Sequence, residues 1–224
     1  MMNRHFFLIP MVCAFAFASA HAAELTLKTT DKEPPAALSA ELRALLAPKV
    51  IQLLDGEKPA FEFWLVKELP LTAKPASAGK VLDKLKTASL LGAVNIPADR
   101  RDYRDDELHP GVYSMRFVLQ PQDGNHLGTA EFNYFAALVP AKLDPTPEGI
   151  TDYKSLIKAS SKETATEHPV ILSLRPASSE AGESPKLNAP VPEHKSVRVQ
   201  IPAKAGEART SVTFEIVYEG KGHK

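Results

Sequence analysis

The chain has 224 residues, of which 27 are basic and 27 are acidic, and 44% are apolar. This balance is typical of a globular protein, and it gives no reason to expect nucleic acid as a partner. The sequence has no block of like charges and no basic amphipathic helix, so it also does not predict binding to a membrane surface. Nineteen prolines against 11 glycines favour short strands and rigid connections over long helices.

Residues 1–22 have the pattern of a cleavable signal peptide. Asn3, Arg4 and His5 precede an apolar run over 6–18, and small residues lead to a cleavage site after Ala22. The run is shorter than the roughly 20 residues of a membrane span. We therefore expect a periplasmic or secreted protein without a membrane span. Cleavage removes Cys13, the only cysteine, so the mature chain would have neither a disulfide nor a thiolate metal site.

The first half of the mature chain predicts strands and two short helices. Strand patterns cover 24–29, 50–54, 61–66 and 90–96, and a turn at Asp55-Gly56 joins the second of these to the third. Four leucines at 38, 42, 45 and 46 form one helical stripe that ends at Pro48. A second helix is expected from Ser77, with Val81, Leu82 and Leu85 facing inward.

The second half predicts five more strands and one helix. The clearest strand is 112–120, in which Tyr113, Met115, Phe117 and Leu119 share one face. Strands at 132–139, 170–174, 197–201 and 212–218 follow, with a helix at 151–158. Residues 176–194, which are rich in proline and serine, are expected to form a loop.

These elements predict a mainly β fold, a two-layer β-sandwich of about eight or nine short strands with two or three short connecting helices. Two strands beyond the loop at 176–194 cannot form an independent core. We therefore expect residues 23–224 to form a single domain, which includes that loop.

Two polar loops at strand ends are the candidate ligand-binding site, because sandwiches commonly bind at such ends. The first loop is a charged run over 99–107, followed by His109, and the second is the turn over 121–128. Their candidate ligand-binding residues are Arg101, Arg104, Asp105, Asp106, His109, Asp123, Asn125 and His126. The competing interpretation is that these charges form a solvated edge or pair with one another within the turns.

Other motifs predict no catalytic residue, metal ligand or cofactor. Ser155 and Lys158 match the SxxK pattern of serine acyl-enzymes, but the companion elements are missing, so both are expected to be exposed helix residues. The histidines are not spaced as metal ligands. Trp64 is expected to be a packed anchor, although with Phe61 and Phe63 it could also form a platform for a sugar.

Several segments resemble a family of uncharacterised exported bacterial proteins. They are the FEFW segment at 61–64, the YRDDE loop at 103–107, the PGVYSMRF strand at 110–117 and the QPQDGNHLG turn at 120–128, with similar stretches at 160–162 and 168–174. The resemblance implies export and a single domain, and it implies no activity.

The sequence therefore predicts a non-catalytic binding or assembly module of the periplasm or cell envelope, whose partner is an exported protein or an envelope glycan. One alternative is a hydrolase that uses loop carboxylates such as Asp106 and Asp123 as general acid and base. Another is a metal-binding protein with histidine and aspartate ligands. No cofactor is predicted.

Overall fold

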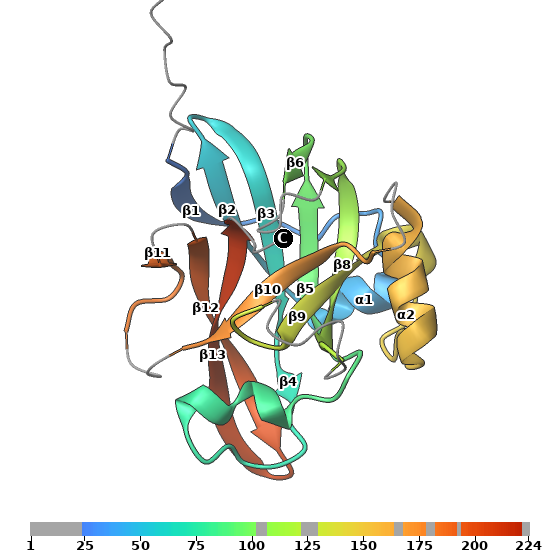
Figure 1. Cartoon of the computed structure of the whole chain (residues 1–224), viewed down its shortest axis with the longest axis vertical. Coiled ribbons are helices and arrows are strands. Elements are labelled where there is room, and N and C mark those ends of the chain that lie inside the picture. Colours follow the sequence, from blue (N-terminus) through green and yellow to red (C-terminus); the bar gives the residue numbers. More distant parts are fainter. Residues whose placement is uncertain are drawn as a thin grey trace, which may run out of the picture.

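The fold is mainly β, with one large curled sheet and two short α-helices, as the computed structural model of the chain shows (Figure 1). The structure describes residues 24–101, 107–121, 130–163, 168–177, 182–191 and 194–220. The expected signal peptide lies outside the described residues. The strands are β1 Thr26–Asp31, β2 Leu46–Asp55, β3 Lys58–Val66, β4 Leu69–Pro70, β5 Leu90–Ile96, β6 Arg100–Arg101, β7 Glu107–Leu108, β8 Gly111–Leu119, β9 Tyr134–Pro140, β10 Ile171–Pro176, β11 Lys186–Val191, β12 His194–Ala205 and β13 Ala208–Glu219. The α-helices are α1 Ala40–Leu45 and α2 Tyr153–Ser160, and the 3-10 helices are η1 Ala78–Lys80, η2 Leu82–Lys84, η3 Ala141–Leu143 and η4 Ser161–Glu163.

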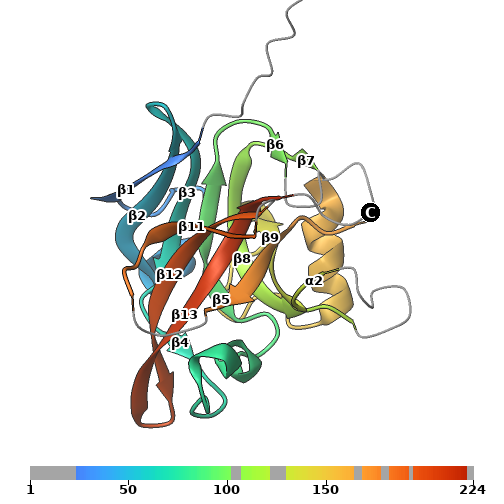
Figure 2. The same ribbon diagram turned by 60° about the vertical axis from the view of Figure 1, so that its left-hand side comes forward.

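Ten strands follow one another across the sheet in the order β1-β2-β3-β5-β8-β9-β10-β13-β12-β11, and every neighbouring pair is antiparallel. The short strand β4 pairs in parallel with β12, which makes the sheet mixed. The sheet curls into a half-barrel, so that its first strand β1 comes into contact with its last strand β11 (Figure 2). The expected two-layer sandwich is therefore wrong. A single sheet wraps around its own core because long antiparallel strands, such as the 12-residue β12 and β13, twist and coil.

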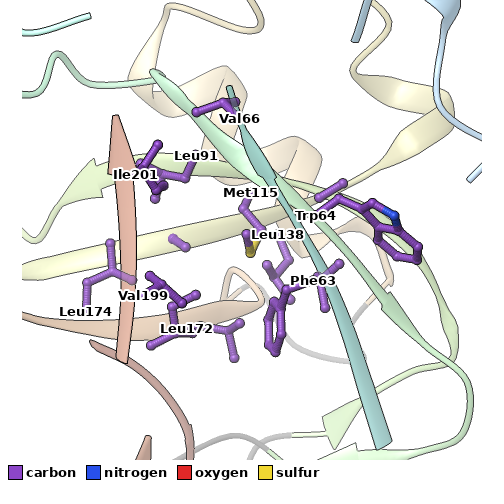
Figure 3. Close-up of a cluster of buried hydrophobic side chains, with 14 of the residues drawn as sticks. Phe63, Trp64, Val66, Leu91, Met115, Leu138, Leu172, Leu174, Val199 and Ile201 are labelled. Atoms are coloured by element: carbon purple, nitrogen blue, oxygen red, sulfur yellow. The ribbon is translucent and has the colours of Figure 1, made fainter. Parts of the chain in front are cut away.

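The main core fills the concave side of the curled sheet. Met115 of β8 and Leu138 of β9, which are directly opposite on neighbouring strands, lie there together with Phe63 of β3, and all three are fully buried (Figure 3). Trp64 points to the other side of β3, because successive residues of a strand face opposite sides. It is 1% exposed, and its indole Nε1 donates to the Lys32 carbonyl at 2.9 Å. Trp64 is thus the packed anchor that the sequence predicts.

The helix α2 covers part of the convex side of the sheet. Asp152 caps its first turn by accepting from the Ser155 amide at 2.8 Å, and Leu156 is fully buried against β9 and its neighbours. Ser155 and Lys158 are both exposed, as expected. The helix predicted at 151–158 is confirmed with a shift of two residues.

Two helix predictions and one loop prediction need correction. The leucine stripe gives only the six-residue α1, after which Leu46 already belongs to β2, and Leu45 is 40% exposed rather than inward. The helix expected from Ser77 forms two 3-10 turns, although its predicted inward side chains are buried. The loop expected at 176–194 contains β11, because an edge strand tolerates Pro190, whose missing amide would matter only in a central strand.

Candidate functional site

The described part of the predicted loop site consists of local turn contacts. Arg101 lies in the two-stranded ribbon of β6 and β7 and pairs with Glu107 at 3.7 Å. The His109 Nδ1 lies 3.1 Å from an Asp99 carboxylate oxygen, and both side chains are largely exposed. Both contacts are of the kind that the competing interpretation expects, and ligand binding by Arg101 and His109 stays a prediction. The other predicted residues lie outside the described residues: Arg104, Asp105, Asp106, Asp123, Asn125 and His126.

A groove of about 580 Å³ lies between the end of α1, the end of β3, β4 and two loops, 86–90 and 147–151. This volume falls within the range of small-molecule and peptide sites. Half of the described residues that line it are apolar and they contribute most of its surface, and Leu45 is one of only two large apolar side chains that the described chain leaves exposed. The apolar members are Ala44, Leu45, Val66, Pro70, Ala88, Leu90 and Pro147.

The buried guanidinium of Arg116 holds both loop walls of this groove. Arg116 is fully buried on β8 and forms a two-point ion pair with Asp144, from Nε to Oδ2 at 2.7 Å and from Nη2 to Oδ1 at 3.0 Å. Its Nη1 donates to the carbonyl of Ala88 at 3.2 Å, which belongs to one wall. Nη2 donates to the carbonyl of Thr146 at 2.7 Å and Nη1 to that of Pro147 at 2.8 Å, and these residues lead into the other wall. One side chain thus fixes the separation of the two loops.

Both loop walls contain backbone in the left-handed region. Gly149 has a φ of 67°, and a Cβ there would lie 2.5 Å from Arg116 Cζ, so only glycine allows the loop to pass this close. Ala88 has a φ of 68°, which costs a non-glycine residue about 1–2 kcal/mol. The Ala88 amide donates to the Phe117 carbonyl at 2.8 Å, so β8 holds this conformation at two points. Such enforced strain is typical of binding sites and clamps.

The positive and negative charges of the side chains that line the groove cancel. Lys67 and Lys86 contribute two positive charges, and Glu68 and Glu148 contribute two negative charges. The Lys67 Nζ is already engaged, because it donates to the Ala44 carbonyl at 2.7 Å. Selection of a ligand by this groove would therefore depend on its apolar floor and its shape rather than on net charge.

A second buried polar cluster, around Glu62, lies on the convex face of β2, β3 and β5. The Glu62 carboxylate is 3% exposed and accepts from Lys32 at 2.6 Å, Gln52 at 2.8 Å and Asn95 at 2.8 Å. Burial raises its pKa, but the hydrogen bonds from these three donors and the charge of Lys32 outweigh burial and lower the pKa below its ordinary value of 4.5. A carboxylate so completely engaged ties strands together rather than binding a ligand.

The Glu62 cluster predicts a pH dependence of stability. A carboxyl with a lowered pKa in the folded chain stabilises the fold above its unfolded pKa, and this contribution is lost as the pH falls through the folded value. We expect the free energy of unfolding to fall between about pH 5 and about pH 2 with a steeper slope in the wild type than in Glu62→Gln. Urea unfolding across this range measures both slopes. Glu57→Gln, at the exposed turn of the same hairpin, should keep the wild-type slope, and equal slopes in all three proteins would contradict the assignment.

Among the described residues, no group of three or more His, Cys, Asp or Glu side chains is placed to hold a metal ion. Within the same residues, no helix has the length and apolar character to cross a membrane. The hydrolase alternative depends on Asp106 and Asp123, outside these residues, and stays a prediction.

The sequence interpretation missed the groove because its key residue resembles an ordinary outward-facing strand residue. Arg116 alternates with Met115 and Phe117, which indicates a half-exposed strand. The available signal was the stretch that follows β9, where two prolines and a threonine lie between Asp144 and Gly149 and can return the chain to a buried cation.

Comparison of the chain with protein-family models, with curated proteins and with solved structures finds no match, so the groove geometry and the sequence patterns are the basis for a functional assignment.

Proposed function

We propose that this protein is an exported, non-catalytic binding or assembly module whose groove takes an apolar segment of another exported protein. The observation that carries the proposal is the Arg116 clamp, which holds both walls of an apolar groove open at a cost in backbone strain. A fold that needed only stability would close such a groove over Leu45 and Leu90, because burying apolar surface is favourable. The residues that resemble a signal peptide support export.

The composition of the groove favours a protein segment over the glycan that the sequence also allowed. None of the described residues that line it is aromatic, so it offers no flat ring on which a sugar could stack. The exposed Leu45 side chain instead provides an apolar contact of the kind found at the centre of protein interfaces.

The groove also favours binding over catalysis. Its carboxylates, Glu68 and Glu148, are both on exposed residues, whereas an acid–base pair needs an environment that burial or a close charge has altered. The buried ionic groups at the groove, Arg116 and Asp144, are engaged with each other and with the backbone, so they position the walls.

Leu45→Glu should strongly weaken partner capture without unfolding the protein. Leu45 is 40% exposed, so the substitution leaves the core intact, but it puts a charge where an apolar segment would bind. We expect affinity for the partner to fall roughly tenfold or more. The matched control is Leu119→Glu, because Leu119 is 39% exposed and does not line the groove.

A photo-crosslinking residue at position 45, compared with the same residue at position 119, identifies the partner in intact cells. The proposal expects one crosslinked exported protein at position 45 that is absent at position 119. The purified partner should then bind the wild type and Leu119→Glu, but not Leu45→Glu. Equal binding to all three purified proteins would show that the groove is not the binding site.

A further inference from the structure

A second cavity, of about 600 Å³, lies over β10, β13 and β11 and shares no described lining residue with the groove. These strands lie side by side with β12 in the sheet (Figures 1 and 2). Its lining contains an arginine, an amide and an aromatic ring, which the described lining of the groove does not have, and also a carboxylate; these groups come from Arg175, Asn188, Phe132 and Glu215. This mixture of an apolar wall with a few convergent polar groups is typical of small-molecule sites.

Arg175 is the cation of this cavity, and part of its hydrogen-bonding capacity is unused. It lies on β10 directly opposite Glu215 of β13, and its guanidinium carbon stands 5.5 Å from the centre of the Phe132 ring. Its Nη2 pairs with Glu131 at 3.2 Å. Its Nη1 is buried and makes no hydrogen bond within the part of the chain that the structure describes. A buried donor without a partner is costly, and an acceptor bound in the cavity would remove this cost once the guanidinium turned its Nη1 toward the cavity.

The two carboxylates near Arg175 differ in how firmly they are held. Glu215 accepts from Asn188 Nδ2 at 3.0 Å and from Ser196 Oγ at 2.8 Å, and it lies opposite Arg198 of β12. These two hydrogen bonds hold the carboxylate in the wall, next to the strand that carries Arg198, so it can remain there beside a bound anion. The side chain of Glu131 is 43% exposed, and an ion pair this exposed contributes little, so it can yield to a stronger ligand.

We propose that this cavity binds a small organic carboxylate, whose oxygen atoms accept hydrogen bonds from Arg175. Arginine presents parallel N–H donors that match the two oxygens of a carboxylate. The ligand would take the free Nη1 and compete with Glu131 for Nη2. This site goes beyond the proposed function, because the groove and the cavity have separate linings and either can bind without the other.

Titration calorimetry with galacturonate, succinate, inorganic phosphate and galactose tests the proposal. We expect millimolar or tighter binding of at least one of the two carboxylates, and no binding of galactose. Binding of galacturonate alone would identify an acidic sugar, and binding of succinate would identify a simple organic acid; both support the site. Equal binding of galactose and galacturonate, tighter binding of phosphate, or no binding of either carboxylate would overturn it.

Three variants locate the binding. Arg175→Gln should weaken binding of the carboxylate roughly tenfold to a hundredfold, the loss expected for charge-assisted hydrogen bonds. Glu131→Gln should tighten it several-fold, because the competing carboxylate is gone. Arg209→Gln is the matched control, since Arg209 is exposed on β13 about six residues, or roughly 20 Å, from Glu215. Melting curves confirm that each variant folds. Unchanged binding in Arg175→Gln, or weaker binding in Glu131→Gln, would contradict the proposal.

Discussion

Asp144→Ala should lower the free energy of unfolding by about 3–5 kcal/mol, because it removes the only carboxylate that the described residues place on the buried Arg116 guanidinium. Asp144 is 1% exposed and also accepts from the Ser114 hydroxyl. Three backbone carbonyls would remain around Arg116, but they carry no full charge to offset the buried cation. In a domain of this size the loss corresponds to a fall in melting temperature of about 6–20 °C.

The control for this change is Asp99→Ala. Asp99 also pairs with a basic side chain, His109, but its own side chain is 79% exposed, so we expect a loss of about 1 kcal/mol or less. Urea unfolding of both variants against the wild type provides the comparison. If Asp144→Ala cost no more than Asp99→Ala, the carbonyl contacts alone would suffice to hold Arg116, and the ion pair would not be the basis of the clamp.

Local patterns in the sequence were enough to predict most strands of the sheet. The strand predicted at 90–96 matches β5, and the two strands around Asp55-Gly56 are the hairpin of β2 and β3. In these segments the alternation of apolar residues, the turn residues and the prolines all agree, so tertiary contacts had nothing to override. An exception among the strand patterns is Leu119, at the end of β8, which the alternation placed with the core although it is 39% exposed.

The order of the strands could not be predicted in the same way. Alternation shows which side chains share a face, but it does not show which strands become neighbours. The sequence therefore allowed two packed layers, whereas β8 pairs with β9, β9 pairs with β10, and β10 pairs with β13 without a break between sheets. The curl that replaces the second layer arises from the accumulated twist of these pairs.

The groove was unpredictable for a related reason: it depends on contacts between residues far apart in the chain. Arg116 reaches Ala88 and Asp144, each 28 residues away, and neither contact leaves a periodic signal. The polar loops attracted attention because charged turns are visible in a sequence, whereas a strained loop such as the one at Ala88 is not. Only the backbone geometry reveals that strain.

Phe117→Ala should also lower the free energy of unfolding by about 3–5 kcal/mol, through a cavity in the concave core. Phe117 is fully buried, and its ring stacks on Tyr134 with centroids 6.3 Å apart. Leu119→Ala is the matched control on the same strand, because Leu119 follows two residues later in the same alternation yet is 39% exposed. We expect this second change to cost about 0.5 kcal/mol or less. Urea unfolding of the two variants measures the difference directly.

Similar losses would mean that the end of β8 is as buried as its middle, and that the concave core extends to the edge that the structure leaves open. A large difference, in contrast, would show that the core ends between these two residues, where the curl of the sheet turns β8 outward.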